Sequence, residues 1–172
     1  GMEPEETRIY PEASSAAHVL GFVGKNDEGE DAGYFGLEGN YDLSLSGKPG
    51  FLQRESDAKG VPILSADSLE ISAVGGVDLM TNIDKTVQLV IEKRLSEGIE
   101  KYGAQAGSVV VMNPKNGAIY GMASFPSYDP SEYFDFSDEL FKNPIVSSSF
   151  EPGSIFKVLV MSAALDSGVV KP

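Results

Sequence analysis

The chain has 172 residues, of which 41% are hydrophobic, and a formal net charge of −13. This size allows one ordinary domain or two small pieces with a hydrophobic core. The absence of cysteine excludes disulfides, thiolate metal sites and a cysteine nucleophile, and the strongly acidic charge argues against nucleic acid as a partner.

The first part of the chain, residues 2–76, is rich in glycine, serine and acidic residues and contains only short apolar runs. This composition predicts small helices, turns and short strands rather than a regular sheet. One helix is expected from Ser14 or Ser15 to Leu20, with the serine as its N-cap and Gly21 as its stop.

Three polar or glycine-rich features of this first part are interpreted as structural. His18 is the only histidine, and without cysteine or a paired acidic motif we predict that it packs rather than binds a metal. The acidic run at 27–31 is interrupted by glycine, which favours a solvated loop over a calcium site. Gly75 and Gly76 predict a hinge between the two parts.

The second part, residues 77–172, opens with a predicted amphipathic helix. Asp84 is a suitable cap for this helix and Gly103 a suitable stop. Apolar residues recur at spacings of three and four along one face, as expected for packing: Val87, Val90, Ile91, Leu95 and Ile99.

A β-hairpin and a long aromatic loop are expected next. Residues 108–112 form a β-branched run and residues 118–123 return as a second strand, with proline, asparagine and glycine between them. The polar segment 124–144 carries six aromatic residues, which more often anchor a long loop to the domain surface than line a groove. We therefore predict packing there and assign no site.

The run from Glu151 to Lys157 is the strongest candidate for chemistry. Lys157 is the only charged residue between Ser154 and Leu165, and a helix that is apolar nearly all round is normally buried. The order helix, hairpin, loop, buried helix predicts an α+β domain.

Ser154 and Lys157 have the spacing of a nucleophile and its base. Residues three apart share a helix face, and the free N–H groups of a first turn favour developing negative charge. Burial disfavours the charged ammonium of a lysine, so a neutral amine would accept the serine proton. Two alternatives stay open: Ser154 as a helix N-cap with Lys157 extending over apolar surface, and Glu151 as a cap rather than a group that tunes Lys157.

The chain resembles the class B penicillin-binding proteins, peptidoglycan transpeptidases whose active-site serine lies in a serine-x-x-lysine motif. Ordered matches cover nearly the whole sequence. They comprise Arg8–Pro11, Ala16–Gly24, Gly36–Asp42 with Leu45, Gly47 and Gly50, Thr81–Asp84 with Gln88, Gly107–Met112, Gly117–Ala123, Pro126–Pro130 and Glu151–Lys157.

The chain departs from the family pattern at a few positions. Ile155 stands where the family often has threonine, and Asn113 and Asn116 stand where it commonly has aspartate and threonine. The family also needs a serine-x-asparagine motif and a lysine-threonine-glycine strand after the nucleophile, and neither occurs before Pro172. We therefore expect a fragment with little or no activity of its own.

The resemblance implies an irregular pedestal or dimerisation module over residues 2–76, followed over 77–172 by the first helix, the hairpin and the nucleophile helix of the transpeptidase domain. Ser154 would attack the penultimate D-alanine of a peptidoglycan stem peptide and Lys157 would take its proton, while penicillin would trap the same serine. The Ser154 N–H would be one oxyanion donor and the missing lysine-threonine-glycine strand would supply the other. No cofactor or metal is implied.

The family resemblance also implies partners and a location. These are peptidoglycan stem peptides, β-lactam antibiotics, other cell-wall synthesis or division proteins, and a second copy in a homodimer. The location is the extracytoplasmic face of the bacterial membrane, with an anchor upstream of this chain, because no apolar stretch here approaches the roughly 18 residues of a membrane span. Alternatives are a non-catalytic interaction module and, ranked lower, a serine β-lactamase or β-lactam sensor.

Overall fold

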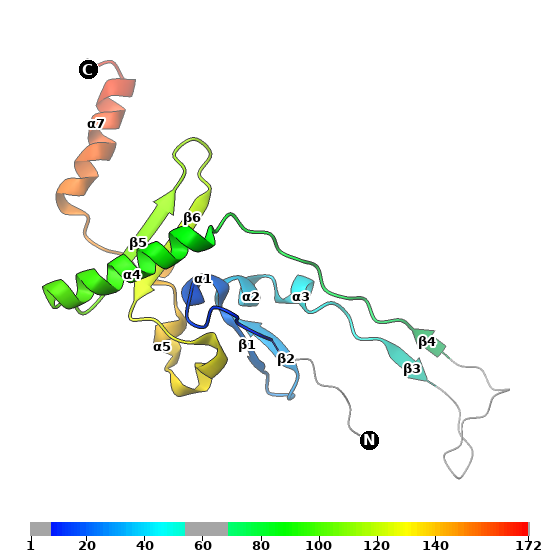
Figure 1. Cartoon of the computed structure of the whole chain (residues 1–172). Coiled ribbons are helices and arrows are strands. Elements are labelled where there is room, and N and C mark those ends of the chain that lie inside the picture. The colour runs from blue at the N-terminus through cyan, green and yellow to red at the C-terminus, as the bar shows by residue number, and fades with distance from the viewer. Residues whose placement is uncertain (1–7, 54–68, 172) are drawn as a thin grey trace, which may run out of the picture.

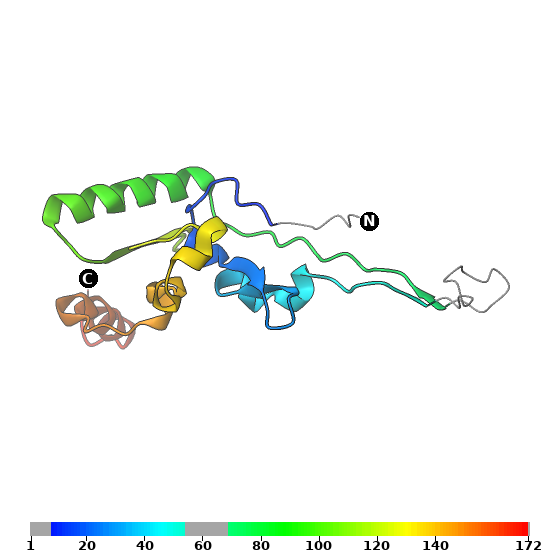
Figure 2. The ribbon, with the colours of Figure 1, turned by 90° about the horizontal axis from the view of Figure 1, so that it is seen from below.

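The structure is a computed structural model that describes residues 8–53 and 69–171. Its body is elongated, with a thin two-stranded ribbon at one end and a helix that stands away from the body at the other (Figures 1 and 2). The mixture of short helices, small antiparallel sheets and one long helix confirms the predicted α+β class.

The first part of the chain contains small elements that pack closely on one another. They are α1 (Ala17–Leu20), β1 (Phe22–Lys25), β2 (Asp31–Tyr34), α2 (Gly36–Asn40) and α3 (Asp42–Leu45). β1 and β2 form an antiparallel hairpin, whose turn carries the acidic run as exposed residues, as predicted. Buried Glu38 in α2 is neutralised by Arg8, whose guanidinium lies 2.6 Å from its carboxylate.

The first helix is shorter than predicted and starts differently. It begins at Ala17, and neither serine caps it, because Ala16 adopts a left-handed conformation with φ of 56°. The Ala16 N–H instead donates to the carboxylate of Glu92, a residue of the long helix, at 2.7 Å. Gly21 ends the helix with φ of 77°, as predicted.

The ribbon consists of β3 (Phe51–Gln53) and β4 (Leu69–Ile71), an antiparallel pair. Beyond it, Lys48 and Val74 exchange backbone hydrogen bonds of 2.8 and 2.9 Å, so the pairing continues toward the body. A Cβ added to Gly76 would lie 1.7 Å from the Leu45 carbonyl oxygen. The predicted hinge residues Gly75 and Gly76 therefore lie between two hydrogen-bonded residues, Val74 and Val77, and Gly76 lies close against Leu45.

The long helix α4 (Lys85–Tyr102) confirms the predicted boundaries. The Asp84 carboxylate accepts a hydrogen bond from the Val87 N–H at 2.9 Å, and Gly103 ends the helix with φ of 62°. Val90, which is predicted to lie on the packing face, is 52% exposed. Gln88 is buried instead, because its amide makes two hydrogen bonds to the backbone of Met122 in the adjacent hairpin.

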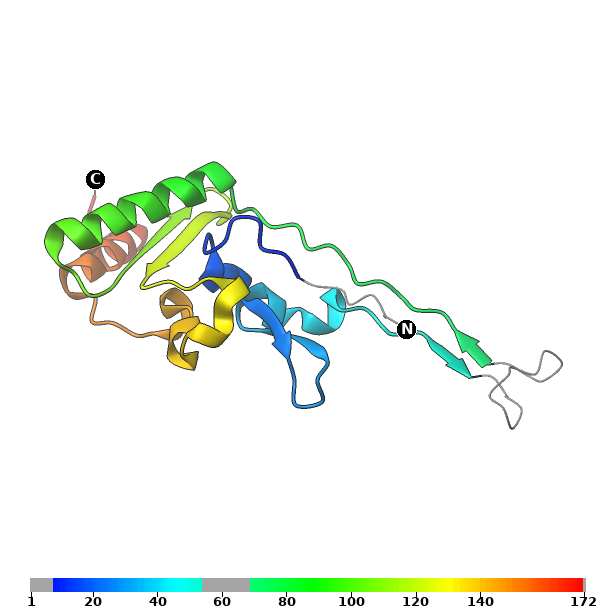
Figure 3. The ribbon, with the colours of Figure 1, turned by 60° about the horizontal axis from the view of Figure 1, so that its bottom comes forward.

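The hairpin of β5 (Gly107–Met112) and β6 (Ile119–Phe125) lies against α4, as Figure 3 shows. It matches the predicted hairpin, with a register shift between Val111 and Met112. α4 covers one face of this two-stranded sheet, so the two elements form a compact unit.

The aromatic segment after the hairpin folds into short helices rather than an open loop. They are η1 (Pro130–Asp135), α5 (Asp138–Phe141) and α6 (Pro144–Ser147). The predicted packing role is confirmed for Tyr128 and Phe141, which are 1% and 4% exposed, whereas Phe134 is 71% exposed.

The hydrophobic core joins the two parts of the chain. Ala17 and Phe22 come from the first part, and they pack with Tyr128 and Phe141 from the second. The Tyr128 hydroxyl donates to the Ala17 carbonyl at 2.9 Å, and burial raises the pKa of Tyr128 well above its usual value. The first and second parts of the chain therefore share this core cluster.

Candidate active site

Ser154 and Lys157 lie one helical turn apart at the junction of two helices. Ser154 belongs to the 3₁₀ turn η2 (Gly153–Phe156), and Lys157 is the first residue of α7 (Lys157–Asp166). Gly153 has φ of 56°, a left-handed conformation that glycine adopts without strain and that bends the chain into the turn. The Lys157 N–H donates to the Ser154 carbonyl, which fixes the backbone between the two residues.

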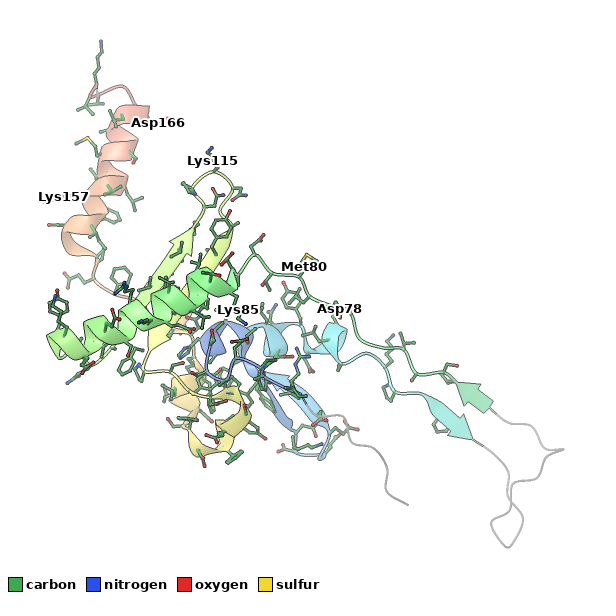
Figure 4. The ribbon with its side chains drawn as sticks, viewed as in Figure 1. Asp78, Met80, Lys85, Lys115, Lys157 and Asp166 are labelled. Carbon is green, nitrogen blue, oxygen red and sulfur yellow. The ribbon has the colours of Figure 1, made fainter. Side chains whose placement is uncertain are left out.

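The helix that begins at Lys157 stands away from the body, and its expected burial is wrong for this structure. Figure 4 shows Lys157 at its start and Asp166 near its far end. Its apolar side chains are exposed on all sides, for example Val158 at 69% and Leu159 at 61%. Among the described elements only the adjacent turn η2 packs substantially against it, so an apolar helix is present without the surface that would bury it.

The two candidate side chains are both exposed, and within residues 8–53 and 69–171 no hydrogen bond joins them. The desolvation that the sequence argument required for Lys157 is therefore not present in this arrangement. Glu151 is exposed as well and forms no ion pair with Lys157.

The backbone of the turn leaves the amide of Ser154 free to donate a hydrogen bond. The Ile155 N–H donates to the Pro152 carbonyl at 3.3 Å, while the Ser154 N–H has no acceptor within the described part of the chain. A free N–H on the nucleophile itself is one of the donors that can stabilise a tetrahedral oxyanion. The turn can thus supply a hydroxyl, an amine and one oxyanion donor.

Outside this turn, we considered the single histidine, metal-binding clusters and membrane-spanning helices. His18 is 6% exposed and its ring packs edge-on against Tyr128, which agrees with the predicted packing role. No group of three histidine, aspartate or glutamate residues that could hold a metal occurs among the residues that the structure describes. In the same residues, every helix is too short or too polar to cross a membrane.

Asn143 was not predicted as a site residue, but it lies at the start of the segment that leads to Ser154. Its side chain caps α6, accepting a hydrogen bond from the Ile145 N–H at 3.1 Å. The available signal was an asparagine directly before proline, a pair that marks the start of a helix.

Comparison with protein families gives two matches in order along the chain. Residues 1–81 match the "Penicillin-binding Protein dimerisation domain", and residues 107–172 match the "Penicillin binding protein transpeptidase domain". Ser154 and Lys157 both fall in the second region.

Similar proteins and structures agree with these matches. Stage V sporulation protein D of Bacillus subtilis is 36% identical over 94% of this chain and 25% of its own length. The probable peptidoglycan D,D-transpeptidase PbpC of Pseudomonas aeruginosa is 35% identical over 95% of this chain and 28% of its own length. A peptidoglycan synthetase structure from Bifidobacterium adolescentis superimposes with a TM-score of 0.77 and 30% identity over 95% of this chain and 29% of that one.

The structure of penicillin-binding protein 2X from Streptococcus thermophilus shares the fold, with a TM-score of 0.69 and 24% identity over 95% of this chain and 25% of that one. The chain spans about a quarter of the length of the curated relatives that it matches. With a dimerisation-domain match followed by the start of a transpeptidase domain, the chain belongs to the class B penicillin-binding proteins.

Proposed function

We propose that this chain carries the nucleophile and base of a peptidoglycan D,D-transpeptidase, with Ser154 as nucleophile and Lys157 as base. The observation that supports this most directly is their placement one turn apart at the head of a helix, within the region that matches the transpeptidase domain. We further propose that residues 2–76 act as the pedestal or dimerisation module and residues 77–172 as the beginning of the catalytic domain.

The proposed reaction proceeds through an acyl-serine. The Ser154 hydroxyl oxygen attacks the carbonyl carbon of the penultimate D-alanine of a stem peptide, while the neutral amine of Lys157 takes the hydroxyl proton. Breaking the peptide bond releases the terminal D-alanine, whose nitrogen receives that proton. An amine on a neighbouring peptidoglycan strand then attacks the ester carbonyl and forms the new peptide bond, while the bond to the serine oxygen breaks and that oxygen takes back a proton from the amine by way of Lys157. A β-lactam would enter the same first step, but its opened ring stays attached and blocks the second.

We expect the full-length protein to carry out this reaction and the 172-residue chain alone to have little or no activity. Both side chains are exposed here, so water surrounds the nucleophile and the base. The chain alone therefore lacks the dry surroundings in which the proposed proton transfer would take place. Stem peptides and β-lactams are accordingly the proposed ligands of the full-length protein, which we place at the extracytoplasmic face of the membrane with other cell-wall synthesis proteins as partners.

Release of D-alanine from a synthetic stem pentapeptide tests the proposal. The full-length protein should release D-alanine, and Ser154→Ala and Lys157→Ala should each reduce the rate at least about a hundredfold. The matched controls are Ser162→Ala and Lys171→Ala, which remove the same groups elsewhere in the exposed C-terminal segment. Retention of wild-type activity by Ser154→Ala would overturn the proposed role of Ser154.

A further inference from the structure

The segment that carries Ser154 leaves the body of the protein between Phe141 and residue 146. All residues from 146 to 163 are exposed, and we call this segment the catalytic arm. Phe141, just before it, is 4% exposed and belongs to the core. The residues between Phe141 and the catalytic arm therefore determine where the arm starts.

Asn143 joins three elements at this point. Its amide nitrogen donates to the His18 carbonyl in α1 at 3.4 Å and contacts the Met122 sulfur in β6 at 3.2 Å. Its amide oxygen accepts from the Ile145 N–H of α6 at 3.1 Å. One side chain thus connects the body to the first turn of the segment that leads to Ser154.

The groups that Asn143 contacts on the body are themselves held in place. The Met122 backbone makes hydrogen bonds of 2.9 and 2.8 Å with the buried Gln88 amide. The His18 ring forms a 2.9 Å hydrogen bond with the Leu140 carbonyl. On the arm side, the Asn143 carbonyl accepts from the Ser147 hydroxyl at 2.6 Å. Asn143 therefore couples a fixed surface to the base of an exposed segment.

We propose that Asn143 is a positioning residue for Ser154, an inference that rests on the proposed function. Its amide fixes the origin and direction of the catalytic arm, so that Ser154 reaches the reacting carbonyl in the right orientation. Small displacements of a reacting group cost rate because proximity and orientation supply much of the acceleration. The role belongs to the nitrogen of the amide, because the oxygen serves only the helix cap.

The substitution Asn143→Asp separates these two functions. A carboxylate keeps an oxygen for the Ile145 N–H, but it removes the donor to the His18 carbonyl and the contact to Met122. The matched control is Asn116→Asp, the same chemical change in the exposed hairpin turn, where the side-chain oxygen likewise accepts a backbone N–H, that of Ala118 at 3.1 Å.

The readout is acylation of the full-length protein by benzylpenicillin, followed as a function of concentration. We expect Asn143→Asp to lower the rate constant at saturation about tenfold or more and to change the half-saturating concentration less than about threefold, because it moves the serine rather than the surface that binds the ligand. Asn116→Asp should match the wild type in both quantities.

The outcomes distinguish this inference from the proposed function. If the wild type is acylated at Ser154 and Asn143→Asp matches Asn116→Asp, the positioning role is wrong and the proposed function stands. If Asn143→Asp changes only the half-saturating concentration, the residue acts in binding and the positioning role is also wrong. If the wild type forms no adduct at Ser154, the proposed function fails, and the positioning role fails with it.

Discussion

His18 shows how a polar residue can serve the core of this protein. Because a carbonyl can only accept, the ring nitrogen Nε2 must carry the proton that it shares with the Leu140 carbonyl. Burial lowers the pKa of His18 below its usual value of 6.5, and the hydrogen bond to Leu140 opposes this only in part. The folded protein therefore favours the neutral ring.

This preference predicts a pH-dependent contribution to stability. A histidine whose pKa is lowered in the folded state stabilises the protein fully above pH 6.5, and this contribution is lost as the pH falls through the lowered value. The difference in unfolding free energy between wild type and His18→Gln should therefore shrink between about pH 7.5 and about pH 5. Urea unfolding of both proteins at both pH values measures this difference. The acidic residues are the same in the two proteins, so their contribution to the pH dependence cancels in the difference. An unchanged difference would show that folding does not lower the pKa of His18.

Several conformations at the residue scale were not accessible from the sequence. Ala13, Ala16 and Phe35 all have positive φ, which local preference disfavours for residues other than glycine. At Ala16 the conformation aims the N–H at Glu92, a residue 76 positions away. Only the tertiary contact explains the positive φ of Ala16. The burial of Gln88 likewise depends on a tertiary contact, its hydrogen bonds to Met122.

At the scale of elements, α4 could be predicted because its signals are local. Asp84, the apolar spacing and Gly103 all act within the helix itself, and the structure agrees with each boundary. Helix α7 is the opposite case. Its apolar composition predicts burial, but burial depends on a partner surface, and none of the described elements except η2 supplies one. The spacing in the sequence thus predicts the candidate pair Ser154 and Lys157, but it does not predict that both side chains are exposed.

The cap of α4 gives a prediction at this scale. Asp84→Ala removes the acceptor of the Val87 N–H and should lower the free energy of unfolding by about 1 kcal/mol. Asp78→Ala removes the same charge from an exposed position and should change it by less than about 0.5 kcal/mol. Chemical denaturation of the two variants beside the wild type measures both values. Equal effects would mean that charge, rather than capping, is responsible.

At the scale of the whole molecule, the core crosses the boundary that we propose between residues 76 and 77. Phe22 stacks on Tyr133 with ring centroids 4.4 Å apart and meets Phe141 edge-on at 4.8 Å. The packing role of the aromatic segment was predicted from its composition. Its partners were not, because the contacts join residues more than a hundred positions apart and local pattern carries no information about them.

This shared core predicts that the second part is not stable alone. A protein of residues 77–172 would expose Tyr128 and Phe141, which are 1% and 4% exposed in the whole chain. It should bind more of the dye ANS per molecule than the 172-residue chain and melt without a cooperative transition. Fluorescence and thermal melting of both proteins test this. A sharp transition in the shorter protein would show that its core is independent.

The site of β-lactam attachment in the full-length protein shows directly whether Ser154 is the nucleophile. After incubation with benzylpenicillin and proteolysis, peptide mass spectrometry should find one antibiotic molecule per protein, attached to Ser154. Ser154→Ala should carry none, and Ser162→Ala should match the wild type. An adduct on another residue, or an adduct that survives Ser154→Ala, would contradict the assignment of Ser154 as the nucleophile.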